Sequence, residues 1–275
     1  MRTDDELDRA AALIAAADAL LVCAGAGMGV DSGLPDFRGD EGFWRAYPPY
    51  ERLGLRFAEM ADPRHFAEDP ALAWGFYGHR LELYRRTVPH EGFALLRKWG
   101  EAKPGGAAVF TSNVDGQFQK AGFGLVAEVH GSIHHLQCTV PCGERIWSAA
   151  DLHVEIDEST MRAVEPLPEC LDCGRLARPN ILMFGDFDWL SRRSDEQLRA
   201  VNEWRREWPD VVVLELGAGQ AVPTVRRYAE LASAANGALV RINPREPGVR
   251  HGRGVSLPYG ALDTLTALDE LLTAG

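Results

Sequence analysis

Four of the five cysteines fall into two close pairs, Cys138/Cys142 and Cys170/Cys173, with the pattern C-x3-C, 27 intervening residues and C-x2-C. Paired thiolates on two turns can supply all four ligands of a closed, tetrahedral Zn²⁺ site, which is structural rather than catalytic. In a chain without a secretory signal, such pairs indicate metal binding more than disulfides. Four unrelated core cysteines are one alternative. A zinc ribbon that binds nucleic acid is another, and the absence of a basic patch around the pairs disfavours it.

A glycine-rich loop, GAGMGVDSGLPDFRG, follows the apolar run ALLVCA. Glycines let the backbone approach a pyrophosphate, and the free N–H groups of a following helix can bind its oxygens. Gly25 and Gly27 fit the pattern G-x-G-x-x-G, but a valine stands at its third glycine. An ordinary connection between strand and helix is therefore the alternative. The loop ends with an acid, an aromatic ring and a guanidinium that could cover a ligand as a lid: Asp36, Phe37 and Arg38.

Two further segments carry candidate polar residues. Asn113 and Asp115 lie in TSNVDGQFQKAG, directly after an apolar run, where this sequence could also simply cap a helix. His130 lies in EVHGSIHHLQC. A histidine titrates near neutral pH and can act as a general base, although a lone histidine is more often structural. We interpret the neighbouring His134 and His135 as structural or surface residues.

The elements that must position these residues form an alternating pattern. Short apolar runs rich in β-branched residues predict strands at 19–24, 107–112, 125–129, 211–216 and 238–243. Helices are expected at 4–18, 89–99, 116–121, 222–236 and 261–272. Because the strands lack hydrophobic alternation, they suit a parallel sheet that is buried on both faces. The sequence therefore predicts an α/β fold with a Rossmann-like, doubly wound parallel sheet.

Two regions interrupt this pattern, and we interpret both as insertions that form a smaller second domain. Residues 40–88 are aromatic and helical, and residues 138–180 hold the cysteines in irregular, proline-bearing sequence. The expected domains are a Rossmann-like nucleotide-binding domain at 1–40, 103–137 and 205–275, and a small domain with a helical module at 41–102 and a zinc-binding module at 138–204.

Charge and composition indicate which kinds of binding partner and which cellular compartment to expect. The net charge of -11 disfavours a non-specific grip on nucleic acid, so no nucleic-acid partner is expected. The first residues are acidic and lack the basic region of a secretory signal. No apolar run reaches the roughly 18 residues that a membrane span requires. We expect a cytoplasmic protein that does not associate with membranes.

Taken together, these motifs resemble those of the sirtuins, the NAD-dependent protein deacylases. The glycine loop is similar to the family's GAGxSxxSGIPDFRG, and Thr111–Gly122 is similar to TQNIDxLHxxAG. The HGS segment matches the family's catalytic histidine, and RPNILMFGD resembles RPxVVxFGE. The resemblance spans about residues 20–245 in family order. Departures from the family pattern are Gly29, Leu34, Ser112, Phe118 and Asp186, and a loop LGAGQAVP that is one residue shorter than GTSxxVxP.

The resemblance implies a role for each matching residue. His130 would be the catalytic base. Asn113 and Asp115 would line the nicotinamide pocket, Ser112 would face the adjoining ribose, and Asn243 would contact the adenosine ribose. The other implied NAD-binding residues are Gly25, Ala26, Gly27, Asp36, Phe37, Arg38, Gly217, Ala218 and Gly219. The segment that would pair with the substrate peptide as an added strand includes Leu182, Phe184 and Gly185. Cys138, Cys142, Cys170 and Cys173 would hold Zn²⁺.

The implied reaction consumes NAD as a co-substrate. An acyl-lysine of a protein or peptide would pass its acyl group to the ribose, with release of nicotinamide and formation of O-acyl-ADP-ribose. Two alternatives remain open. Ser112, Phe118 and the altered GTS-like loop leave room for protein ADP-ribosyl transfer or plain NAD hydrolysis. A non-catalytic sensor of NAD or ADP-ribose is the second, although pure binding would not need a base at His130.

One feature bears on the acyl group. Tyr77 and Arg80 form Y-x-x-R on an expected helix, and a spacing of three places both on one face. A phenol beside a guanidinium suits a carboxylate. The pair resembles the sirtuin branch that removes succinyl, malonyl and glutaryl groups. We therefore hypothesise acidic acyl-lysines as substrates. An aromatic and basic helix face that packs on the domain surface is the alternative.

Overall fold

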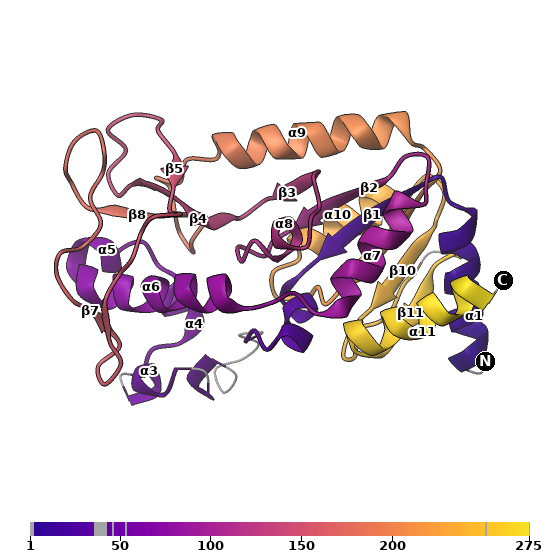
Figure 1. The fold of residues 1–275 in the computed structure, drawn as a ribbon, viewed down its shortest axis with the longest axis horizontal. Helices are drawn as coiled ribbons and strands as arrows, with labels where there is room; N and C mark the ends of the chain where they lie inside the picture. The colour runs from indigo at the N-terminus through magenta and orange to yellow at the C-terminus, as the bar shows by residue number, and fades with distance from the viewer. Residues whose placement is uncertain (1–2, 36–42, 46, 53, 251, 275) are drawn as a thin grey trace.

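The computed structural model describes residues 3–35, 43–45, 47–52, 54–250 and 252–274. Its elements form two lobes that lie side by side along the long axis of the molecule (Figure 1). One lobe contains a six-stranded sheet and carries both ends of the chain. The other is built around one long helix and a small antiparallel sheet. Among the described helices, none is long and apolar enough to cross a membrane.

The larger lobe contains a parallel sheet with the strand order β11-β10-β9-β1-β2-β3. All five neighbouring pairs are parallel. The five predicted strands are confirmed, with ends that differ by no more than one residue, whereas the three-residue β11 was not predicted. The bounds are β1 (Ala19–Ala24), β2 (Ala107–Thr111), β3 (Val126–Glu128), β9 (Val211–Leu216), β10 (Leu239–Ile242) and β11 (Val255–Leu257).

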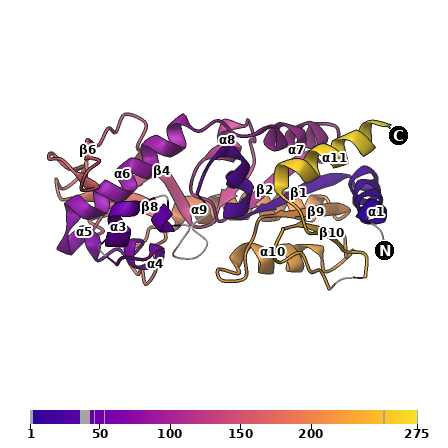
Figure 2. The ribbon, with the colours of Figure 1, turned by 90° about the horizontal axis from the view of Figure 1, so that it is seen from below.

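Helices cover both faces of this sheet (Figure 2). In β1, Leu20 and Val22 pack against one helical layer, and Leu21 and Cys23 against the other. Burial on both faces is why the strand is apolar throughout. The first layer is α1 (Thr3–Ala16), α7 (Glu91–Glu101), α8 (Gln117–Lys120) and α11 (Ala261–Ala274); the second is α9 (Arg192–Glu207) and α10 (Thr224–Ser233). A 3₁₀ helix, η1 (Ala26–Ser32), follows β1.

Helix α9 was not predicted, because its sequence RRSDEQLRAVNEWRRE is almost entirely polar. It contacts β3 and β2, and its Val201 is buried in the core of the sheet lobe. Most of α9 falls within the range 138–204 that the sequence assigned to the zinc-binding module. The domain boundaries stay a prediction. Three segments lie in the other lobe than these ranges imply: α9 and α7 pack on the large sheet, and residues 131–137 belong to the small antiparallel sheet.

The smaller lobe combines the helical region and the cysteine region. An aromatic cluster fills its core, in which Phe43, Tyr47, Tyr50 and Phe76 contact one another. Its helices are α3 (Pro48–Arg52), α4 (Phe57–Met60), α5 (His65–Glu68) and α6 (Pro70–Arg86). One antiparallel sheet has the order β5-β4-β8, and a hairpin joins β6 to β7. The bounds are β4 (Gly131–Cys138), β5 (Trp147–Ser148), β6 (Ile156–Asp157), β7 (Arg162–Ala163) and β8 (Ala177–Ile181).

Candidate active site

A cleft of about 710 Å³ is lined by residues from both lobes. The sheet lobe contributes the loops that follow β1, β2 and β9, and the small lobe contributes residues of α6 and the segment after β8. From the inner strand β1 the chain first extends the sheet to one edge through β2 and β3. It then returns to the other side of β1 and extends the sheet through β9, β10 and β11, so the strand order reverses between β1 and β9. Ligands of doubly wound sheets bind at this reversal, outside the carboxyl ends of the strands. The cleft therefore lies where a nucleotide is expected.

The two glycine loops pack backbone against backbone at this reversal. Gly217 has φ 60°, and a Cβ on it would lie 2.4 Å from the Cα of Gly27. The amide of Gly27 donates to the carbonyl of Gly217 at 3.1 Å. Gly25, Ala26, Gly217, Ala218 and Gly219 line the cleft, whereas Gly27 is not among its lining residues. Gly217 thus permits the close packing of the two loops, and Gly27 lies behind the loop surface.

Asn243 supports the loop after β9 from the side that faces away from the cleft. It is fully buried, and its Nδ2 donates to the carbonyl of Ala218 at 2.8 Å. Its Oδ1 accepts from the amides of Arg245 and Glu246. Asn243 is not among the lining residues, and its contact with the adenosine ribose stays a prediction. Arg245 and Glu246, which sequence reasoning missed, do line the cleft, and the Glu246 carboxylate accepts from the amide of Gln220 at 3.0 Å.

The segment after β2 places three polar residues on the cleft wall. Ser112, Asn113 and Asp115 all line it, and Asn113 Nδ2 donates to the carbonyl of Gly25 at 3.1 Å. The Asp115 carboxylate accepts a hydrogen bond from the amide of Gln117 at 2.9 Å. This is the kind of bond expected if the segment simply capped a helix. Burial raises the pKa of Asp115 to about 6. Asp115 is therefore a carboxylate that both stabilises a turn and faces the cleft.

His130 lies between β3 and β4 and lines the cleft. Its carbonyl accepts from the amide of Leu182 at 2.9 Å. The next residue, Gly131, has φ 79°, and a Cβ there would lie 2.0 Å from the carbonyl oxygen of Asn180. Only glycine fits where the backbone of residue 131 crosses that of Asn180, and this close contact fixes the backbone at His130. Burial lowers the pKa of the imidazole, and this favours the neutral ring that a general base requires.

Tyr77 and Arg80 lie on α6, the helix on which their spacing was expected to place them on one face, and both line the cleft. Among the described residues, the buried Tyr77 hydroxyl has no hydrogen-bond partner. Arg80 is 5% exposed, and its Nε and Nη2 donate to the hydroxyl of Tyr84 at 3.0 and 2.6 Å. Its guanidinium carbon lies 5.0 Å from the ring centre of Phe76. Sequence reasoning missed Tyr84, although a spacing of four on a helix places it beside Arg80.

The segment after β8 forms another wall of the cleft. Leu182 and Phe184 line it with side chains that are 36% and 45% exposed, whereas Gly185 is not among the lining residues. A buried ion pair at 2.6 Å between Arg178 of β8 and Asp186 connects this segment to the strand that precedes it. Asp186 thus serves structurally at the position where the family pattern has glutamate. The expected lid residues Asp36, Phe37 and Arg38 lie outside the described residues.

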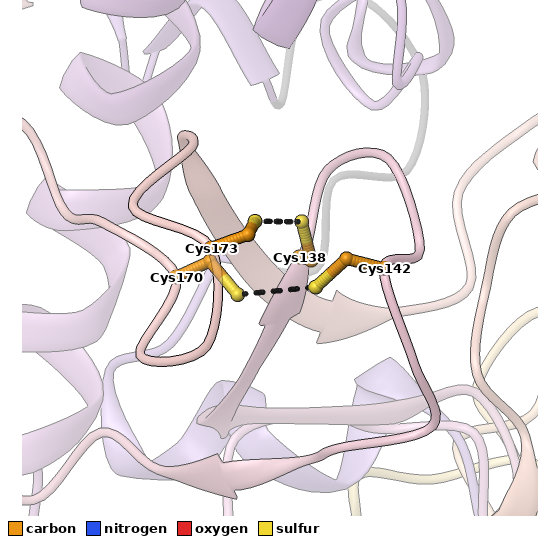
Figure 3. Close-up of side chains that lie close together, drawn as sticks. All are labelled: Cys138, Cys142, Cys170 and Cys173. Carbon is orange, nitrogen blue, oxygen red and sulfur yellow. Dashed lines mark hydrogen bonds between the residues drawn. The ribbon is translucent and has the colours of Figure 1, made fainter.

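The four paired cysteines lie close together (Figure 3). Cys138 ends β4, Cys142 follows it, Cys170 and Cys173 precede β8, and none of the four lines the cleft. Their sulfur atoms all lie within 4.8 Å of one another. The Cys138–Cys173 and Cys142–Cys170 sulfur distances are 3.7 and 3.6 Å. These are too long for disulfides and close to the edge of about 3.8 Å that a tetrahedron of Zn–S bonds has. The donor set therefore fits a closed Zn²⁺ site, and it excludes four unrelated core cysteines.

The family is decided by comparison with known proteins. The Sir2 family model matches residues 25–206. The chain belongs to the Sir2 family. It is 31% identical to NAD-dependent protein deacylase 1 of Archaeoglobus fulgidus, across 85% of this chain and 84% of that protein. It is 34% identical to NAD-dependent protein deacylase 2 of Pyrobaculum aerophilum, across 84% and 82%.

A solved structure supports the same assignment. A crystal structure of a Sir2 homolog–NAD complex superimposes with a TM-score of 0.74 at 25% identity, and the match covers 96% of this chain and 93% of that one. The Sir2 fold thus extends over both lobes. Phe118, where the family pattern has histidine, is buried in the sheet lobe against Phe93 and Phe123. This departure therefore alters core packing, and Phe118 is not among the residues that line the cleft.

Proposed function

We propose that this Sir2 protein is an NAD-dependent lysine deacylase that releases nicotinamide and forms O-acyl-ADP-ribose. The observation that carries the proposal is one cleft that contains His130, Asn113, Asp115 and both glycine loops on one side, and the segment after β8 on the other. Its relatives in Archaeoglobus and Pyrobaculum are named as deacylases, which supports the same activity. The expected partner is an acyl-lysine protein or peptide.

NAD supplies the ribose carbon that receives the acyl oxygen and the nicotinamide that leaves. The loops at Gly25 and Gly217 would hold the pyrophosphate with backbone N–H groups. Ionised Asp115 would accept a hydrogen bond from the nicotinamide amide, and Asn113 would help to orient it. Neutral His130 would remove a proton from a ribose hydroxyl after nicotinamide has left, which allows the acyl group to pass to the sugar.

The segment after β8 would bind the substrate backbone. The amides of Leu182, Met183 and Phe184 already donate to His130, Asp186 and Ala61. An added peptide strand would therefore donate its own amides to carbonyl oxygens of this segment. Such binding recognises the main chain of the substrate and depends little on its side chains. Four thiolates provide the closed Zn²⁺ site, which has a structural role and takes no part in the chemistry. A reducing compartment would preserve them, and a cytoplasmic location stays a prediction.

Incubation with NAD and a panel of acyl-lysine peptides, with mass spectrometry of both products, tests the proposal. Deacylated peptide and O-acyl-ADP-ribose in equal amounts are expected. Free ADP-ribose without deacylated peptide would indicate NAD hydrolysis. A mass gain of ADP-ribose on a protein would indicate transfer to protein. Binding of NAD without consumption would indicate the sensor.

The pH dependence follows from two buried groups. Asp115 must be ionised, and its pKa is raised to about 6; His130 must be neutral, and burial lowers its pKa. Both conditions fail as the pH falls, so kcat/KM is expected to decrease below about pH 6 and to be level between about pH 7 and about pH 8. The measurement is a pH profile with circular dichroism at each pH to confirm folding. A level profile down to about pH 5 would contradict these roles.

We further propose that the acyl pocket prefers an acidic acyl group. A carboxylate could accept from the Tyr77 hydroxyl, which lacks a partner among the described residues, and from the buried guanidinium of Arg80. The alternative of a helix face packed on the domain surface does not explain why both residues line the cleft.

Arg80→Met is expected to lower kcat/KM for a succinyl-lysine peptide about a hundredfold, because loss of a buried charged partner for a carboxylate costs about 3 kcal/mol. Turnover of the acetyl-lysine peptide should change no more than about threefold. Tyr77→Phe, which removes only the hydroxyl, should lower succinyl turnover about tenfold. Arg86→Met, on the exposed end of the same helix, is the matched control. Unchanged succinyl turnover in Arg80→Met would exclude the acidic pocket.

A further inference from the structure

The ring of His130 is held from across the lobe boundary. Its Nε2 lies 3.3 Å from the Thr224 hydroxyl. Thr224 is the first residue of α10, which packs on the large sheet, whereas His130 precedes β4 of the small lobe. Among the described residues, Thr224 is the one side chain that hydrogen-bonds to this ring.

The backbone around His130 is fixed, but the backbone alone does not orient the ring. The crossing at Gly131 and the bond from Leu182 locate the Cα, while the two side-chain torsions remain free to choose among rotamers. A bond to Nε2 limits that choice of rotamer. The Thr224 hydroxyl can donate to this nitrogen or accept from it, so it can hold the ring in either neutral tautomer. A general base needs this orientation, because proton transfer depends on distances of hydrogen-bond length.

The contact also joins the base to the cofactor loop. Thr224 follows directly after the loop in which Gly217 to Val222 line the cleft. The segment that would hold the dinucleotide therefore continues into the residue that holds the ring. We propose that Thr224 is a positioning residue that orients His130 for proton removal from the ribose hydroxyl. This inference rests on the proposed deacylase function and on His130 as its base.

The variants Thr224→Val and Thr224→Ser test the proposal. Valine keeps the branched shape and removes the hydroxyl, while serine keeps the hydroxyl. Since the base acts after nicotinamide leaves, Thr224→Val is expected to lower the rate of O-acyl-ADP-ribose formation about tenfold, the effect of one lost hydrogen bond. Exchange of labelled nicotinamide into NAD, which precedes the base, should stay within about twofold, as should KM for NAD. Thr224→Ser should restore turnover. Thr266→Val, an exposed threonine on α11, is the matched control.

The outcomes separate this inference from the proposed function. Full turnover in Thr224→Val, or a parallel loss of exchange and turnover, would overturn the positioning role. A wild-type protein without deacylation would overturn the proposed function first, and with it the role of His130 as base. Nitrogen-15 NMR of the His130 ring tests the contact itself, whatever the activity. The Nε2 signal, which reports this hydrogen bond, should change in Thr224→Val and stay as in the wild type in Thr224→Ser, and unchanged signals in both would overturn the inference.

Discussion

His130→Ala is expected to slow formation of O-acyl-ADP-ribose by about a hundredfold to ten-thousandfold, the usual contribution of a positioned general base. His130 lines the cleft, burial lowers its pKa, and its backbone is fixed by Gly131. Alanine removes the imidazole and leaves these backbone bonds intact. The fold and the affinity for NAD should therefore change little, with a Kd within about threefold of the wild type.

Single-turnover kinetics with a labelled acyl-lysine peptide measure this loss, and calorimetry measures NAD binding. Exchange of labelled nicotinamide should persist, because the base acts after the nicotinamide bond has broken. The control is His153→Ala, a histidine exposed on the small lobe, which should behave as the wild type. If His130→Ala kept more than about a tenth of the wild-type rate, the imidazole would not be the base.

Loss of the metal is expected to abolish activity by unfolding part of the small lobe. Cys138 ends β4 and Cys170 and Cys173 precede β8, so the thiolates connect the far ends of two paired strands. The near ends of the same strands adjoin His130 and Leu182. Structural Zn²⁺ sites contribute about 10 kcal/mol or more to folding in small domains.

Cys170→Ser is expected to lose most bound zinc and to lower turnover more than about a hundredfold. Zinc content, near-UV circular dichroism and thermal unfolding measure the effect, and prolonged chelation should reproduce it in the wild type. Cys23→Ala provides the matched control, because this buried cysteine belongs to β1 and not to the cluster. A zinc-free protein with native turnover would show that the site has no structural role.

The sequence by itself determined the architecture of the sheet lobe and the identity of the metal site. Strands buried on both faces are mainly apolar, so β1 and β9 could be recognised without a structure, although β9 also contains Glu215, which is buried in an ion pair with Arg241. Thiolates with close spacing have few uses, so the cysteine cluster could be predicted as well. Helix α9 escaped recognition because only one edge of it is buried, and β11 because three residues carry too little pattern.

The tertiary structure alone decided which side chains meet. Thr224 and His130 are 94 residues apart, and no local pattern relates them. Asn243 matches a family position, yet its amide supports the Ala218 carbonyl from behind the cleft. Glu246 reaches the Gln220 amide only because β9 and β10 are adjacent in the sheet. Periodicity and motifs report the surroundings of short segments, whereas contacts between distant segments depend on how strands and lobes pack, which no short stretch of sequence encodes.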